Sequence, residues 1–453
     1  MKLIILLQQA LLSLESLKEY YFSQNEIISK IVDEKSEKYK YGVALERYLF
    51  AKATNMDELL NDEDGENCRN IAEKMIRDLN IDDDEIATKI SYRLEIEEEI
   101  AEEYELDPNK ASREYRKIIE MPILFNNSTI MMLLIKYEEA IAGLFEYAIR
   151  KYPNAYLKEK TVTYTEIMEI NDNVQNIKQF FCNKEVEEIM HLGISDWYKL
   201  LSDKHKVNFD SLTVETFNTF KEIYYRRNII VHNNGKINKT YLCNLPSELT
   251  KNMRIGDEIS CGNDYMQKAF DMTYMMLYGT FLSMIKICDE PDKLKKLIFD
   301  NGFQHMIQHE WNISAFIFGN LLKVKPSDNS DLELNKINYW ISMKNLLGYE
   351  YIKDEVLVYD VSVLSVEYKI AKAALCEEFN KVNLLLEDAI EREIPAYAVA
   401  TWPLFNQYRE SDEYQYFKNK HKDEFELLGY EPENIEYESS EDNEDLINKC
   451  EKI

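Results

Sequence analysis

The sequence predicts an all-α protein. Hydrophobic residues make up 45% of its 453 residues, whereas the chain has only 12 Gly and 9 Pro. A composition this poor in turn formers is typical of a globular, helix-rich protein. Apolar residues also recur at spacings of three and four in segment after segment, which is the period of an amphipathic helix. The length corresponds to about two to three domains.

Charge and cysteine content limit the classes of function. The formal net charge of -29 argues against a general coat for nucleic acid or for an anionic membrane, because such a protein needs a broad cationic surface. A small cationic site that acts on one phosphate stays open. The seven cysteines stand singly, with no CxxC pair. This usage is typical of a reducing compartment and indicates neither a disulfide framework nor a zinc knuckle.

Residues 1–115 are expected to form a helical N-terminal region. The start, MKLIILLQQALLSLESLKEYY, superficially resembles a signal peptide, but Gln8 and Gln9 interrupt its apolar run. The run then continues as an amphipathic pattern, so we interpret it as the first helix. No stretch reaches the roughly 18 uninterrupted apolar residues of a membrane span. We therefore expect a soluble, cytoplasmic protein with no membrane partner.

Residues 116–288 are expected to form a central helical bundle. A long apolar helix is predicted at 121–153, where Pro153 ends it, and another at 262–288. Between them, SLTVETFNTFKEIYYRRNIIVHNNG (211–235) has apolar residues on one helical face. Asn233, Asn234 and Gly235 then supply the left-handed conformation that ends a helix.

The remaining chain is predicted to be helical up to residue 430. Small and apolar residues in 368–410, from YKIAKAAL to PLFNQYRE, resemble a single tetratricopeptide-type helix pair. We therefore expect 289–430 to be a helical, weakly tetratricopeptide-like region. Residues 431–453 are acidic and poor in apolar side chains, which predicts a flexible tail.

One motif at the end of the 211–235 helix carries candidate chemistry. Arg227-Asn228-Ile229-Ile230-Val231-His232 resembles the arginine, polar residue, three further residues and histidine of the HEPN superfamily. The aromatic-rich helix before it, the NNG after it and the long helices on either side add to the resemblance, which covers about 120–285. The resemblance implies a bundle of four or five helices.

The HEPN resemblance also implies a function. The implied protein is an endoribonuclease that needs neither a metal nor another cofactor. Its RNA products carry a 2',3'-cyclic phosphate and a 5'-hydroxyl. His232 would act as acid or base, Arg227 would clamp the phosphate, and Asn228 would orient them; these residue types suit those roles. HEPN domains with large helical extensions resemble bacterial toxins and abortive-infection ribonucleases, so the expectation includes antiviral defence.

Helix geometry makes this motif half of a site. Asn228 and His232 are four residues apart and share a helical face, whereas Arg227 and His232 are five apart and diverge by about 140°. No second Arg-Asn-x3-His string occurs in the chain. The resemblance therefore implies a homodimer, or a partner that carries the other half.

The charge around the motif is locally positive. Five cations lie between 221 and 239 against the single carboxylate of Glu222. We expect RNA contacts from Arg226, Asn233, Lys236 and Lys239 beside the three catalytic candidates. Tyr224 and Tyr225 could stack on bases, although their spacing is more typical of core residues.

Alternative interpretations stay open. His232 could cap the helix C-terminus, where a cation is favourable, and the bundle could be a non-catalytic dimerisation or protein-binding scaffold. The acidic N-terminal and C-terminal parts could cover the site and keep it silent, and the partners considered include a regulatory protein. His305 and His309 are four apart, but no zincin order surrounds them, so a partly exposed helix face is favoured and no metal is expected.

Overall fold

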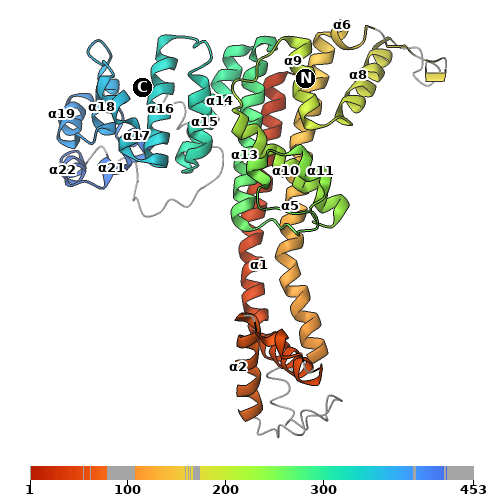
Figure 1. Cartoon of the computed structure of the whole chain (residues 1–453). Helices are drawn as coiled ribbons and strands as arrows, with labels where there is room; N and C mark the ends of the chain where they lie inside the picture. Colours follow the sequence, from red (N-terminus) through yellow and green to blue (C-terminus); the bar gives the residue numbers. More distant parts are fainter. Residues whose placement is uncertain are drawn as a thin grey trace. The chain divides into compact units, whose positions relative to one another are not determined.

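The computed structural model describes residues 2–54, 56–61, 63–78, 108–158, 160–161, 163, 165–166, 174–390, 394–422 and 425. These residues form α-helices and short 3-10 helices (Figure 1), with no strand among them. The only β-type pairing within these ranges is two isolated bridges. The all-α prediction is therefore confirmed.

The helices of the first part of the chain include several long ones. They are α1 (Leu3–Thr54), η1 (Asp57–Leu60), α2 (Glu63–Asp78), α5 (Pro108–Lys151), α6 (Pro153–Tyr156), α8 (Val174–Met190), α9 (Ile194–His205), α10 (Val214–Asn233), α11 (Lys239–Asn244), α12 (Ser247–Thr250), α13 (Asn263–Ser283) and η2 (Met284–Ile287).

The later helices are shorter and follow one another closely. They are α14 (Pro291–Ile307), α15 (Trp311–Leu321), α16 (Asn329–Leu347), α17 (Tyr349–Val358), α18 (Val366–Leu375), α19 (Phe379–Ala389), α20 (Ala396–Thr401), η3 (Pro403–Phe405), α21 (Asn406–Arg409) and α22 (Asp412–Lys420). Successive helices from α14 to α19 contact one another, and α18 with α19 forms the helix pair of the predicted tetratricopeptide-like segment. The wider likeness to that repeat stays a prediction.

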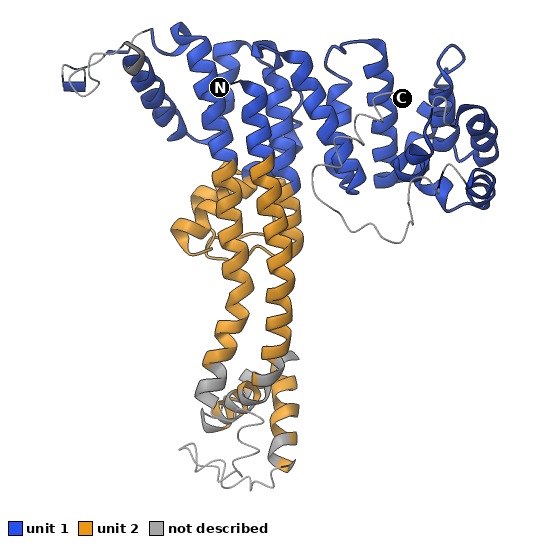
Figure 2. Ribbon diagram, turned by 180° about the vertical axis from the view of Figure 1, so that it is seen from behind, with its two compact units in different colours: residues 1–11, 137–221, 271–453 blue, residues 12–136, 222–270 orange. Residues whose placement is uncertain are grey.

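The chain forms two compact units, each assembled from separate segments (Figure 2). Unit 1 comprises 1–11, 137–221 and 271–453, and unit 2 comprises 12–136 and 222–270. Four of the described helices, α1, α5, α10 and α13, contribute residues to both units. Helix α1 belongs to the predicted N-terminal region 1–115, yet it packs with helices of the predicted bundle 116–288.

The core of unit 2 joins α1, α5 and the start of α13. The ring of Tyr21 is fully buried and stacks on the ring of Phe125 with 5.4 Å between centroids. Its hydroxyl donates to Oδ1 of Asn126 at 3.0 Å, and Nδ2 of Asn126 donates to the carbonyl of Cys261 at 2.6 Å. The buried polar groups of Tyr21 and Asn126 are thus satisfied within the unit.

In the core of unit 1, a glycine lets two helices approach closely, and buried hydroxyls bond to one another. A side chain at Gly143 would place its Cβ 2.5 Å from Cδ1 of Leu6, so α1 and α5 approach closely only because this residue is glycine. Tyr198 bridges the hydroxyls of Tyr137 and Thr280, with 2.5 Å to Oγ1 of Thr280. These contacts fix α5, α9 and α13 against one another.

Several sequence predictions can be compared with these helices. The chain start is helical from Leu3, as predicted. The long apolar helix exists, but α5 begins at Pro108 and passes through Pro122 before it ends at Lys151. The flexible tail predicted at 431–453 lies outside the described residues.

One described helix is compatible with a membrane span by length and composition alone, namely residues 113–151 of α5. A single helix of this kind is weak evidence, because a core helix passes the same test. Many of its apolar side chains are buried inside the protein, among them Ile130, Leu133, Leu134, Ile141 and Leu144.

Candidate functional site

The predicted motif lies on the last turns of α10. The helix ends at Asn233, and the next two residues have left-handed backbones, with φ of 51° at Asn234 and 73° at Gly235. The N–H of Gly235 donates to the carbonyl of Ile229 at 3.0 Å. Asn and Gly adopt this conformation at the least cost, so the helix end predicted from the NNG sequence is confirmed.

The segment after the helix is held by a short antiparallel pairing. The N–H of Ile237 donates to the carbonyl of Asp257 at 2.9 Å, and the N–H of Ile259 donates to the carbonyl of Gly235 at 2.9 Å. Beneath this pairing, Ile229 packs with a buried cluster that includes Ile237 and Tyr241. The end of α10 is therefore tied to the loop that precedes α13.

A polar cluster around the buried carboxylate of Glu222 completes the attachment, and we call it the Glu222 cluster: Glu222, Arg226, Tyr241, Tyr265 and the carbonyl of the exposed Ser260. The Glu222 carboxylate accepts from Nε of Arg226 at 2.8 Å and from the hydroxyls of Tyr241 at 2.5 Å and Tyr265 at 2.8 Å. The Arg226 guanidinium donates to the carbonyl of Ser260 at 2.7 Å and lies 3.9 Å from the centroid of the Tyr265 ring.

The electrostatics of this cluster follow from its burial. The Glu222 and Arg226 side chains are only 10% and 11% exposed. Burial raises the pKa of the Tyr241 and Tyr265 phenols, and the Glu222 carboxylate raises both further. Burial alone lowers the pKa of Arg226, but Tyr265 and Glu222 more than offset this, so its net pKa is raised. Both phenols thus stay donors and Arg226 stays charged at neutral pH.

The three catalytic candidates differ in exposure. His232 is exposed, whereas Arg227 and Asn228 are half-buried. The guanidinium carbon of Arg227 lies 5.1 Å from the centroid of the Tyr224 ring. Because α10 is an α-helix through Asn233, Asn228 and His232 share a face and Arg227 diverges from His232 by about 140°. One copy of the chain therefore presents the two halves of the motif on different faces of α10.

The predicted RNA contacts have neighbours within the chain. Arg226 is occupied by the Glu222 cluster, and Nδ2 of Asn233 donates to the carbonyl of Lys236. Nζ of Lys236 lies 3.4 Å from Glu258, and Lys239 is exposed at the start of α11. Their contact with RNA stays a prediction. The local excess of cations is smaller than the sequence count for 221–239 indicates, because Glu258, which lies outside that range, also faces a cation, Lys236.

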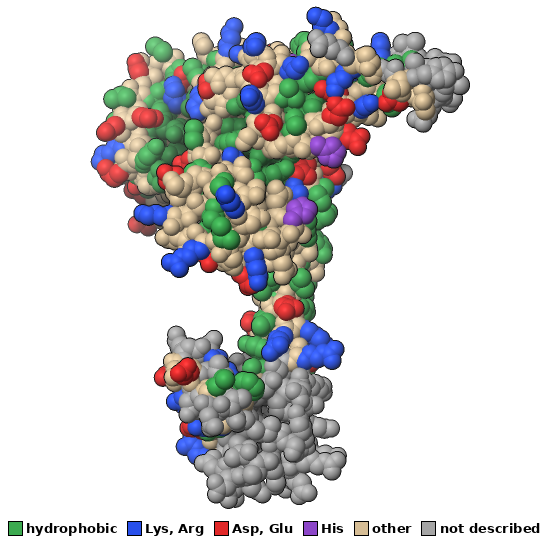
Figure 3. All heavy atoms as spheres, turned by 45° about the vertical axis from the view of Figure 1, so that its right-hand side comes forward, with side chains coloured by type: hydrophobic (Ala, Val, Ile, Leu, Met, Phe, Trp, Pro, Cys, Tyr) green, Lys and Arg blue, Asp and Glu red, His purple; other side chains and the backbone are tan. Residues whose placement is uncertain are grey.

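The wider surface is mixed in charge. On the face drawn in Figure 3, Lys and Arg side chains are interspersed with Asp and Glu side chains over the described residues. A polyanion would have to be held by a local site on this face, since the described residues there form no wide basic field.

The interpretation of His305 and His309 needs a correction. They do not share a partly exposed helix face, because α14 ends at Ile307 and His309 has a left-handed backbone with φ of 60°. His305 is buried, with Nε2 3.0 Å from the Tyr278 hydroxyl and Nδ1 bonded to Glu310. Among the residues that the structure describes, no group of three or more His, Cys, Asp or Glu could hold a metal ion.

Comparisons with protein-family models, curated proteins and solved structures found no match to this chain. The motif and its position on α10 are thus what the chain offers for a functional assignment. The sequence alone did not reveal the Glu222 cluster as its support. The i,i+4 spacing of Glu222 and Arg226 was a usable signal, whereas Tyr241, Ser260 and Tyr265 are brought in by tertiary packing.

Proposed function

We propose that this chain is a metal-independent endoribonuclease of the HEPN type that works as a homodimer in the cytoplasm, as a toxin or abortive-infection effector. The observation that carries the proposal is the Arg227–His232 motif at the end of α10, with His232 exposed. The Glu222 cluster supports it, because a catalytic group needs a helix end held in one position.

The proposed chemistry is transfer of the RNA phosphate to its own 2'-oxygen. His232 of one copy takes the 2'-hydroxyl proton while the 2'-oxygen bonds to phosphorus. The bond from phosphorus to the 5'-oxygen breaks, and the second copy's His232 protonates that oxygen. The two Arg227 guanidiniums stabilise the charge that builds on the phosphate. The products are a 2',3'-cyclic phosphate and a 5'-hydroxyl.

Two copies are required because of the divergence on α10. Because Arg227 and His232 diverge on α10, one copy makes a poor site by itself, and two copies that face each other supply two Arg227 and two His232 around one scissile phosphate. Asn228 shares the face of His232 and orients the imidazole by hydrogen bonding. Lys236 and Lys239 would contact the RNA strand beside the scissile phosphate.

A second candidate is a non-catalytic scaffold that dimerises or binds a protein through this bundle. The observation that favours it is the pairing of Arg226 with Glu222 and of Lys236 with Glu258, which reduces the cationic character of the region. In this alternative, His232 caps the C-terminus of α10, where a cation stabilises the helix dipole.

The test compares cleavage of a mixed RNA pool in EDTA by wild type, His232→Ala and Arg227→Ala. We expect each variant to lose about 100-fold or more of the rate, which is the usual contribution of a general acid or base. His191→Ala is the matched control, since His191 is also exposed but lies outside the motif. Wild-type products should carry 5'-hydroxyl ends.

The result that overturns the nuclease proposal is equal cleavage by wild type and His232→Ala, or no cleavage by wild type. Light scattering on the same samples measures the oligomeric state. An inert dimer would favour the scaffold, whereas an active monomer would contradict the two-copy site.

A further inference from the structure

Helix α5 carries a row of side chains at i,i+4 spacing, which we call the α5 row: Glu120, Leu124, Ser128, Met132 and Lys136. All five residues belong to unit 2. Leu124 and Met132 are 62% and 44% exposed. Glu120 and Ser128 are exposed as well, and Lys136 is half-buried. Large apolar side chains that lie together at such exposure are typical of a surface that binds a partner.

The exposure of the α5 row follows from how α5 packs in unit 2. Helices α1 and α5 lie side by side there (Figure 2), and the ring of Tyr21 on α1 stacks on the ring of Phe125. The next residue, Asn126, is buried and also bonds to Tyr21. Successive residues of a helix are about 100° apart, so Asn126 lies about 160° from Ser128 around α5. Helix α1 therefore covers the side of α5 that carries Asn126 and leaves the α5 row exposed.

The α5 row is symmetric about Ser128. Leu124 and Met132 lie four residues before and after it, about 6 Å away along the helix axis. Glu120 and Lys136 lie eight residues before and after it, about 12 Å away. The inner pair is apolar, whereas the outer pair consists of one acid and one base. A reversed copy of the row would therefore match apolar with apolar side chains and carboxylate with ammonium groups.

This symmetry indicates which partner the α5 row fits. A second copy of α5 that runs antiparallel and crosses at Ser128 would place its Met132 against Leu124 and its Lys136 against Glu120. Rows at i,i+4 spacing pack against each other when two helices cross at about 50°, which is the commonest class of helix packing. The distance between the helix axes depends on the side chains at the contact, and the small Ser128 at the crossing point lets the helices approach closely.

We propose that this chain forms a homodimer in which the α5 row of one copy packs antiparallel on the α5 row of the other. The proposal rests on the proposed function for the expectation of two copies and on the pattern of α5 for the surface. Two-fold symmetry gives each contact twice. The two Glu120–Lys136 ion pairs fix the direction and the register of the helices, and the apolar side chains between them supply most of the affinity.

The experiment is sedimentation equilibrium of the full chain at concentrations up to about 100 μM, because a single helix crossing makes a small, weak interface. We expect wild type to dimerise. Met132→Asp should prevent dimerisation, since it places two carboxylates in the apolar centre of the pairing. Ile119→Asp is the matched control. Ile119 is 41% exposed on the same helix but lies about 180° from Ser128, so its substitution should leave dimerisation unchanged.

An exchange of charges tests the direction of the pairing. Glu120→Lys would set like charges opposite each other at both ends of the α5 row, and so would Lys136→Glu. Each single variant should weaken dimerisation by about ten-fold, because two attractive contacts become repulsive. The double variant restores opposite charges across the interface, so it should dimerise as well as wild type.

Three results would each overturn the proposal: a wild type that stays monomeric, a Met132→Asp variant that dimerises as well as wild type, or a double exchange that is no better than the single variants. RNA cleavage by the same samples separates this proposal from the nuclease. A dimer that depends on the α5 row but cuts no RNA would support the pairing and overturn the nuclease proposal. Cleavage by a dimer that all of these substitutions leave intact would overturn the pairing alone.

Discussion

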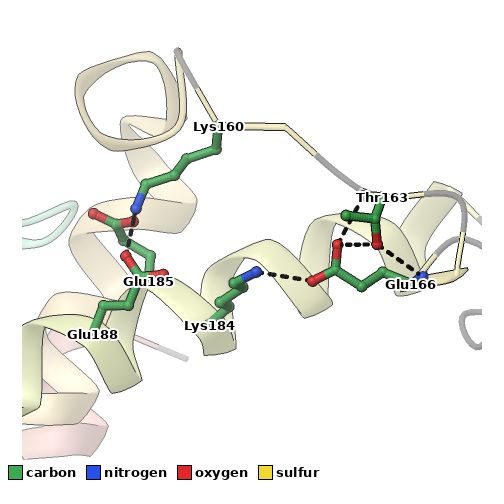
Figure 4. Close-up of polar contacts among 6 residues, drawn as sticks. All are labelled: Lys160, Thr163, Glu166, Lys184, Glu185 and Glu188. Atoms are coloured by element: carbon green, nitrogen blue, oxygen red, sulfur yellow. Dashed lines mark hydrogen bonds and ion pairs between the residues drawn. The ribbon is translucent and has the colours of Figure 1, made fainter.

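Two clusters of acidic and basic side chains in this protein use similar bonds at very different depths. The Glu222 cluster is buried, with its ion pair 10% and 11% exposed. The second, which we call the Lys184 cluster, lies on and beside α8: Lys160, Thr163, Glu166, Lys184, Glu185 and Glu188 (Figure 4). There Lys184 bonds to Glu166 at 2.8 Å, and these side chains are 45% and 23% exposed.

The difference in depth determines what each cluster contributes. Water replaces a lost partner at the surface, so exposed ion pairs contribute little to stability. Inside the protein the remaining charge keeps its desolvation cost after its partner is removed. The Glu222 cluster therefore fixes the end of α10, whereas the Lys184 cluster mainly shifts the pKa values of its own members.

The largest expected effect is that of Glu222→Gln. The change removes the only carboxylate that Arg226 contacts in the Glu222 cluster and leaves its guanidinium buried. We expect the free energy of unfolding to fall by about 3 kcal/mol, which is typical for one broken partner of a buried pair. Urea unfolding followed by circular dichroism measures it.

A double variant provides the control. Adding Arg226→Met to Glu222→Gln removes the stranded charge and should restore part of the lost stability. If Glu222→Gln is as stable as wild type, or if the double variant is no better than the single one, then burial does not govern this cluster.

A smaller effect is expected for Arg226→Lys. Lysine keeps the charge but cannot bond to both Glu222 and the carbonyl of Ser260 with a planar fork, and it stacks less well on Tyr265. We expect a loss of about 2 kcal/mol, as for a hydrogen bond to a charged group. RNA cleavage should also fall if the helix end positions His232. Full cleavage by a destabilised Arg226→Lys protein would contradict that positioning role.

The end of α10 could be predicted because its signals are local in the sequence. The Glu222 cluster that holds this end could not be predicted, because tertiary packing assembles it. The sequence NNG is enough to end α10, because the required backbone conformation suits Asn and Gly. The charge count around the motif treated Arg226 as a surface cation, since nothing in the string places Tyr265 over its guanidinium. The burial of a charged side chain decides its role, and that burial is set only when distant segments pack together.

The same limit applies to the architecture. Helix period predicted the all-α class, but not that α1 shares units with α5 and α13, because an apolar face does not name its neighbour.

The smallest expected effect belongs to Lys184→Met in the Lys184 cluster. Bonds from Lys184 and from Thr163 lower the pKa of Glu166 from 4.5 to about 2. The folded pKa is below the unfolded one, so the contribution of Glu166 to stability is present above pH 4.5 and is lost as the pH falls toward 2. Lys184→Met should raise this pKa toward 4.5, and a carboxyl titration by nuclear magnetic resonance measures it.

Lys160→Met is the matched control, because Lys160 pairs with Glu185 and Glu188 in the same cluster and does not contact Glu166. It should leave the pKa of Glu166 unchanged. Neither lysine variant should move the urea midpoint as far as Arg226→Lys does, because both lysines are exposed to solvent. If Lys184→Met lowered the midpoint as much as Glu222→Gln, depth would not be what separates the two clusters, and the exposed bonds would hold the 160–166 segment in place.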